Sequence, residues 1–137
     1  MKVIKIPYDI SIPLTVCSIG ESKDNSDEEA GRVLDDIKQL INIEWAEIVA
    51  IFNLKSSDAH RDFCLIVDEC GKLKENWEEK INIRASYFYR GSYFGDYIVG
   101  DVVFLARQWN ERFGDCDLAG LTLDEIASFQ EKLYEVL

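Results

Sequence analysis

Five short apolar runs, most of them ended by turn-forming residues, constrain the fold of this chain more than any other feature. Short runs rich in Ile, Val, Phe and Trp are typical of β-strands. A turn at Ser56–Asp58 joins the third run to the fourth and favours an antiparallel pair, and Gly100 marks an expected bulge in the last run. The first two runs form either two strands or one broken strand. The runs are Lys2–Ile6, Ile12–Ser18, Glu44–Leu54, Arg61–Asp68 and Tyr97–Gln108.

Two further stretches have the three- and four-residue apolar spacing of amphipathic helices. The first follows Ser26–Glu29, which has the S-x-x-E form of a capping box, and covers about 14 residues up to Ile41. The second follows a similar box at Thr122–Glu125. Lys72–Lys80 is ambiguous between a loop and a short helical turn. The order β-β-α-β-β-(loop or β)-β-α predicts a single α+β domain over residues 1–137, with a mostly antiparallel sheet and two amphipathic helices.

The charge balance of the chain excludes some classes of partner. The 137 residues include 15 Lys and Arg against 26 Asp and Glu, a formal net charge of −11. Direct nucleic-acid binding is disfavoured, because affinity for phosphate backbones comes from Lys and Arg. The longest uncharged run, Ile10–Gly20, is shorter than the roughly 20 residues of a membrane span, and charged residues interrupt any signal-peptide pattern. We therefore expect a cytoplasmic protein without a membrane partner.

The cysteines and the single histidine give little support to metal binding or catalysis. The C-x5-C spacing of Cys64 and Cys70 is not that of a zinc site, and His60 is the one histidine. A dyad of Cys64 and His60 is disfavoured because burial in an apolar strand would raise the pKa of the thiol. There is also no glycine-rich phosphate loop followed by Lys and Ser or Thr. We expect no enzyme, no metal and no cofactor, and four reduced structural thiols at Cys17, Cys64, Cys70 and Cys116.

The segment from Arg84 to Arg112 is the most unusual part of the chain. It contains eight of the sixteen aromatic residues and four Arg against three acidic residues, a net charge of +1. Rings that stack on bases beside guanidinium groups that bind phosphate are what a nucleotide site requires. The alternative is a hairpin over Tyr87–Tyr97 whose rings pack across strands, with no ligand. The candidate ligand-binding residues are Arg84, Tyr89, Arg90, Phe94, Arg107, Trp109 and Arg112.

Four short motifs point to one known family. Cys64–Leu73 resembles the C-L-I-x-x-E-x-G-K-L hairpin of small proteins from phages and mobile elements, a domain of unknown function. Asn82–Ala85 resembles the N-R-A segment of that family with one residue inserted, and Asp96–Gly100 resembles its D-x-I-x-G strand. Leu121–Ile126 resembles its closing L-T-x-E-x-I helix. The resemblance covers roughly Ile48 to Leu137. It implies a viral or plasmid accessory protein, working in the host cytoplasm, and it supplies no catalytic residues.

Together these patterns predict a non-enzymatic binding protein of phage or mobile-element type with a counter-defence role. One mechanism is sequestration of a small nucleotide signal by the Arg and aromatic residues. The alternative is an acidic inhibitor that mimics DNA and masks a host nucleic-acid-binding protein, although negative charge can also serve solubility alone. Converging Arg side chains would favour the first mechanism and a continuous ridge of carboxylates the second. Short strands and abundant aromatic residues also predict a homodimer or a larger ring.

Overall fold

The chain folds into an antiparallel sheet, six-stranded in the part that the structure describes, with helices packed on both faces, an α+β architecture. The computed structural model describes residues 1–20 and 27–135, with side chains in 1–20 and 32–135. The strands are β1 Lys2–Ile6, β2 Thr15–Ser18, β3 Ala46–Ala50, β4 Arg61–Asp68, β5 Val102–Asn110 and β6 Asp115–Ala119. The α-helices are α1 Asp27–Ile41, α2 Ile83–Ser86 and α3 Leu123–Tyr134, and the 3-10 helices are η1 Gly71–Leu73, η2 Trp77–Lys80 and η3 Arg90–Phe94.

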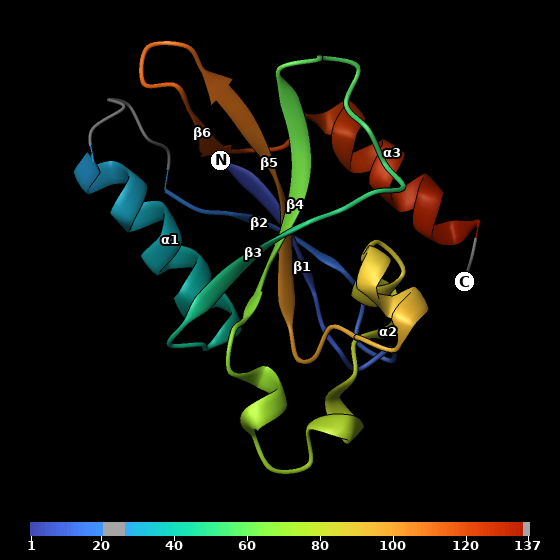
Figure 1. The fold of residues 1–137 in the computed structure, drawn as a ribbon. Coiled ribbons are helices and arrows are strands. Elements are labelled where there is room, and N and C mark those ends of the chain that lie inside the picture. Colours follow the sequence, from blue (N-terminus) through green and yellow to red (C-terminus); the bar gives the residue numbers. More distant parts are fainter. Residues whose placement is uncertain (21–26, 136–137) are drawn as a thin grey trace.

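Strand β5 organises the sheet (Figure 1). The strand order is β2-β1-β5-β4-β3, and β6 also pairs with β5. One edge of β5 pairs with β4 along residues 103–108. The opposite edge pairs first with β1, at residues 102–104, and then with β6, at residues 106–110. All pairs among the described strands are antiparallel. Because β5 lies between β1 and β4, it connects the two halves of the sheet.

Each face of the sheet has its own apolar core, because side chains alternate between the two faces of a strand. On one face α1 packs Val33, Ile37 and Ile41 against a layer that includes Ile66 and Leu105. On the other face α2 and α3 cover a second layer, which is rich in aromatic rings. Figure 1 shows α1 on the opposite side of the sheet from α2 and α3. The buried aromatic residues of the second layer are Phe63, Phe88, Phe104 and Phe129.

Much of the predicted secondary structure is confirmed. The α+β class is as predicted, β1 and β4 have the predicted bounds, and β4 pairs with β3 in antiparallel register. Helix α1 ends at Ile41 as expected, while the capping box predicted at Ser26 lies outside the described residues. The ambiguous stretch Lys72–Lys80 contains short 3-10 turns. No helix of the described residues is long and apolar enough to cross a membrane.

Three local predictions are wrong. The aromatic segment Tyr87–Tyr97 is not a hairpin, because Arg90–Phe94 form the 3-10 helix η3 and no strand lies between α2 and β5 among the described residues. Gly100 lies in a turn before β5, with φ of +84°, so the strand begins at Val102 and not at Tyr97. Strand β6 was not predicted, because Asp115–Ala119 is polar and largely exposed and therefore lacks the apolar run that marks a strand.

The capping box of α3 is confirmed and is tied to the sheet. The Thr122 hydroxyl accepts from the Glu125 amide, and the Glu125 carboxylate accepts from the Thr122 amide. The same carboxylate accepts from Arg61 of β4, with Nε to Oε2 at 2.8 Å and Nη2 to Oε1 at 2.7 Å. Burial raises the pKa of Glu125, but these hydrogen bonds together outweigh it, and the pKa lies below its ordinary value.

This lowered pKa predicts how stability depends on pH. A carboxyl group whose pKa is lower in the folded state stabilises the fold above its unfolded pKa, and this contribution is lost as the pH falls through the folded pKa. In urea titrations, Glu125→Gln should therefore be less stable than wild type at pH 7, and the difference should shrink between about pH 5 and about pH 3. The matched control is Glu131→Gln, at an exposed position of the same helix, which should differ little from wild type at any pH. A difference for Glu125→Gln that is constant over this pH range would contradict the assignment.

Candidate binding groove

Arg84 is a predicted site residue that the structure buries. It lies in α2 and is 7% exposed. Its Nη2 donates hydrogen bonds to the carbonyl oxygens of Pro7 at 2.7 Å, Asp9 at 3.1 Å and Ile12 at 2.9 Å. The guanidinium therefore fastens the loop between β1 and β2 onto α2.

The charge of Arg84 has no carboxylate in direct contact among the described residues. Burial lowers the pKa of its guanidinium, and Asp9 and Asp101 offset this only through longer-range attraction. An Arg side chain nevertheless stays protonated in proteins. Buried charges are usually paired, whereas here backbone carbonyl dipoles are the direct partners of Arg84. The positive charge is therefore incompletely compensated within the described part of the chain.

Arg84 lines a groove of about 400 Å³ between the β1–β2 loop and the C-terminal half of α3. Volumes of about 300–1,000 Å³ are usual for small-molecule sites. Arg84 is the one charged residue among the described residues of the lining. Two apolar walls surround it, and both include well-exposed side chains, Ile10 at 58% and Tyr134 at 82%. The residues that line the groove are Ile10, Pro13, Leu14, Arg84, Gln130, Leu133 and Tyr134.

Tyr89, Arg90 and Phe94 lie around η3, apart from this groove lining. The Tyr89 ring packs against the core, and its hydroxyl donates to Asp96 Oδ2 at 2.8 Å. Tyr89 also lines a smaller hollow of about 140 Å³, whose charged side chains among the described residues are Glu47, Asp68, Glu69, Lys72 and Asp96. Lys72 pairs with Asp96 there. Carboxylates outnumber cations at this hollow, which makes it a poor site for an anion.

Arg107, Trp109 and Arg112 lie at the far end of β5 and in the β5–β6 turn. Asp62 holds Arg107 in a two-point ion pair, with Nε to Oδ1 at 3.0 Å and Nη2 to Oδ2 at 2.6 Å. That hydrogen-bonded pair raises the pKa of Arg107. The Arg112 guanidinium lies 5.4 Å from the centre of the Phe113 ring. Trp109 lines a hollow of about 270 Å³ together with His60 and Cys116.

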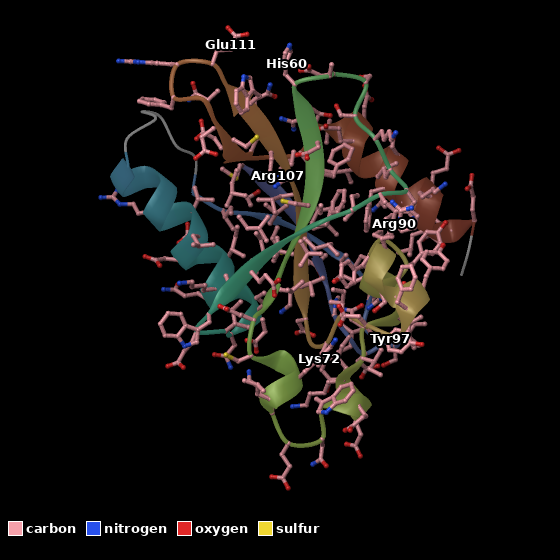
Figure 2. The ribbon with its side chains drawn as sticks, viewed as in Figure 1. His60, Lys72, Arg90, Tyr97, Arg107 and Glu111 are labelled. Carbon is pink, nitrogen blue, oxygen red and sulfur yellow. The ribbon has the colours of Figure 1, made fainter. Side chains whose placement is uncertain are left out.

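The structure thus does not bring the seven predicted residues together in one site. Figure 2 shows Arg90 beside α2 and Arg107 further along the sheet, toward the β5–β6 end. Strand β5 separates the residues around η3 from those near the β5–β6 turn. Their closeness in the sequence does not indicate this separation. Sequence reasoning also missed the walls of the groove, because residues 10–14 and 130–134 are far from Arg84 along the chain. A signal was present in Ile10–Leu14, where apolar side chains occur in a stretch that Pro13 prevents from being a regular strand.

Comparisons with known proteins support the fold and go no further. No protein-family model matches the chain, and no curated protein matches it significantly. A similar solved structure is the crystal structure of the small RNA methyltransferase HEN1, with 17% sequence identity and a TM-score of 0.58. The match covers 94% of this chain but 16% of that one, so the chain spans about one sixth of the length of HEN1. At this identity the likeness concerns the fold alone.

The reactive side chains of the described residues form no evident catalytic group. Burial raises the pKa of the Cys64 thiol to about 12, as predicted from its apolar strand, so the nucleophilic thiolate is scarce at neutral pH. The four cysteines are free thiols: Cys64 is buried, Cys17 and Cys70 are half-buried, and Cys116 is exposed. No cluster of three or more His, Cys, Asp or Glu that could hold a metal occurs in the part of the chain that the structure describes.

Proposed function

We propose that this chain acts by binding a small anionic ligand, without catalysing a reaction, and that the groove lined by Arg84 holds this ligand. The observation that carries the proposal is the buried guanidinium of Arg84, which has no salt bridge among the described residues and lines an open groove. An anion in the groove would supply the missing countercharge. Charge-assisted hydrogen bonds in such a site contribute roughly 1.5–3 kcal/mol each.

The proposed site lies at a different place from the one that the sequence predicts, but it still binds an anion through an Arg side chain. Arg84 remains the cation of the proposed site, whereas Arg107 is paired with Asp62 and is not part of the proposed groove. A nucleotide signal remains a candidate ligand, because the exposed ring of Tyr134 offers a stacking surface at the groove. A role in counter-defence, a host cytoplasmic location and a homo-oligomeric state remain predictions from the sequence.

A titration followed by NMR tests the location of the site. Isotope-labelled protein would be titrated with nucleoside monophosphates, cyclic nucleotides and aliphatic carboxylates. We expect at least one of these anions to shift the backbone amide signals of Leu14, Gln130 and Tyr134, and to leave the indole signal of Trp109 in place. Arg112→Ala serves as the control and should bind with affinity within about twofold of wild type, because Arg112 lies outside the groove.

Two results would contradict the proposal. Shifts centred on Trp109 and the β5–β6 turn, lost in Arg112→Ala, would return the site to the far end of β5. The absence of any groove shift with every anion would leave Arg84 as a structural tie between α2 and the β1–β2 loop.

Masking of a host protein by acidic surface is the second candidate function, and one observation favours it. Ion pairs within the described residues engage five of the basic side chains. Each pair neutralises one positive and one negative charge. The whole net charge of −11 is therefore carried by residues outside these ion pairs. Exposed carboxylates without an ion pair in the described residues include Glu111, Asp115 and Asp117 near the β5–β6 turn. This function becomes the better one if no small anion binds in the groove.

A further inference from the structure

We infer that the groove selects a monoanionic carboxylate with an apolar chain, of the size of a medium-chain fatty acid, over a nucleotide or other polyanion. This inference rests on the proposed function, because it specifies the ligand of the same groove. Three properties of the groove carry it: the composition of the walls, the state of the Arg84 hydrogen-bond donors, and the volume.

The walls are apolar wherever a ligand would extend from Arg84. Within the described part of the chain, Gln130 and the phenol of Tyr134 are the uncharged polar side chains of the lining. The base and sugar of a nucleotide carry many hydrogen-bonding groups, and each one that is buried without a partner weakens binding. An alkyl chain makes no such demand. Each methylene that leaves water for Leu14, Leu133 and the other apolar side chains should strengthen binding by about fourfold, until the groove is full.

The charged side chains at the groove favour a ligand with a single negative charge. Arg84 is the one cation of the lining, and the N–H groups of its Nε and Nη1 donate no hydrogen bond among the described residues. They can therefore donate to a ligand oxygen. Asp9 and Asp101 lie close enough to attract Arg84, so they would repel an anion in front of it. A second or third negative charge on the ligand would add to this repulsion, in a chain whose net charge is already −11.

The volume of the groove determines how long an alkyl chain the ligand can have. A water molecule occupies about 30 Å³ of liquid. On that scale a groove of about 400 Å³ accommodates on the order of a dozen non-hydrogen atoms. Decanoate is a ligand of this size. Acetate would satisfy Arg84 and leave the apolar walls exposed, and decanamide would cover the walls without bringing a charge.

Calorimetric titrations with these probes test the inference, since each probe lacks one feature. We expect decanoate to bind at least about tenfold more tightly than decanamide, acetate and adenosine monophosphate. Two variants add one negative charge each. Gln130→Glu places it in the lining and should weaken decanoate binding by about tenfold, whereas Gln39→Glu, on the exposed face of α1 across the sheet, should change it by less than about twofold.

The outcomes separate the inference from the proposed function. Tight binding of adenosine monophosphate, weakened by Gln130→Glu, with no binding of decanoate would overturn the inference and support the proposed function. Equal affinity for decanoate and decanamide would also overturn it, and so would equal effects of the two Gln→Glu variants. In either case the affinity would not depend on the charge of Arg84. Failure of every anion to bind would overturn both.

Discussion

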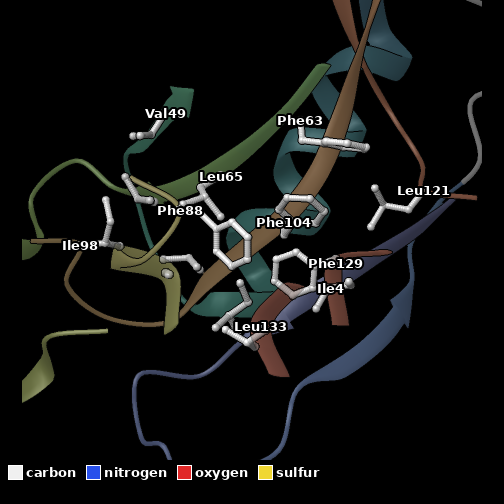
Figure 3. Packing of buried hydrophobic residues seen from close by; sticks show 14 of the residues in the cluster. Ile4, Val49, Phe63, Leu65, Phe88, Ile98, Phe104, Leu121, Phe129 and Leu133 are labelled. Carbon is white, nitrogen blue, oxygen red and sulfur yellow. The ribbon is translucent and has the colours of Figure 1, made fainter. Parts of the chain in front are cut away.

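Phe129→Ala should lower the free energy of unfolding by about 3–5 kcal/mol, measured by urea denaturation at neutral pH. Phe129 is fully buried, and its ring centre lies 4.2 Å from that of Phe104 and 4.8 Å from that of Phe88 (Figure 3). Truncation removes the apolar area of the ring and leaves a cavity between α3 and β5. The surrounding rings cannot close this cavity without shifting a helix or the central strand.

Phe94→Ala is the matched control for this prediction. It removes the same atoms from a ring that is 85% exposed in η3, so the expected change is within about 0.5 kcal/mol. Similar losses in the two variants would mean that the three-ring cluster does not hold α3 to the sheet.

Asn82→Ala should also be strongly destabilising, by about 3 kcal/mol, in the same assay. The Asn82 side chain is fully buried. Its Nδ2 donates to the carbonyl oxygens of Ile6 and Gly100, each at 2.9 Å, and its Oδ1 accepts from the Ala85 amide at 3.0 Å. Alanine would leave all three backbone groups without this partner in a site from which water is excluded. The cost should therefore exceed that of losing ordinary exposed hydrogen bonds.

Asn110→Ala provides the comparison for Asn82. The Asn110 side chain also donates and accepts hydrogen bonds. Its Nδ2 donates to the Asp117 carboxylate and its Oδ1 accepts from the Arg112 amide, but both bonds are exposed to water. We expect a loss below about 1 kcal/mol, because water replaces the missing partner. Equal losses at the two positions would show that burial of the Asn82 network is not what makes it stabilising.

Local signals in the sequence predicted those parts of the fold that local interactions determine. Thr122 and Glu125 form a capping box within one turn of helix, so their spacing alone marks the start of α3. The alternative hairpin for the aromatic segment failed because Tyr87 and Tyr89, just before η3, pack against the core, and this packing depends on core residues that no short window contains. Strand β6 escaped prediction because pairing with β5, and not apolar composition, makes it a strand.

The candidate site was less predictable than the fold, since side-chain partners follow from register. Arg107 is opposite Asp62 because β4 and β5 pair in that register, and this pairing takes Arg107 out of consideration as a free cation. The sequence singles out Arg84 for its charge alone. Its burial and its partners in the β1–β2 loop come from contacts across more than half of the chain.

The central position of β5 has a consequence for the order in which the chain can assemble. Ile4 of β1 pairs with Phe104 of β5, so the β1–β2 hairpin can join the rest of the sheet only after β5, far along the chain, is in place. Closing so long a loop slows folding, whereas the β5–β6 hairpin forms between near neighbours. Until then the apolar side chains of β1 lack the packing partners that β5 provides. We therefore expect the β1–β2 hairpin to stay accessible to chaperones and proteases until β5 has paired with it.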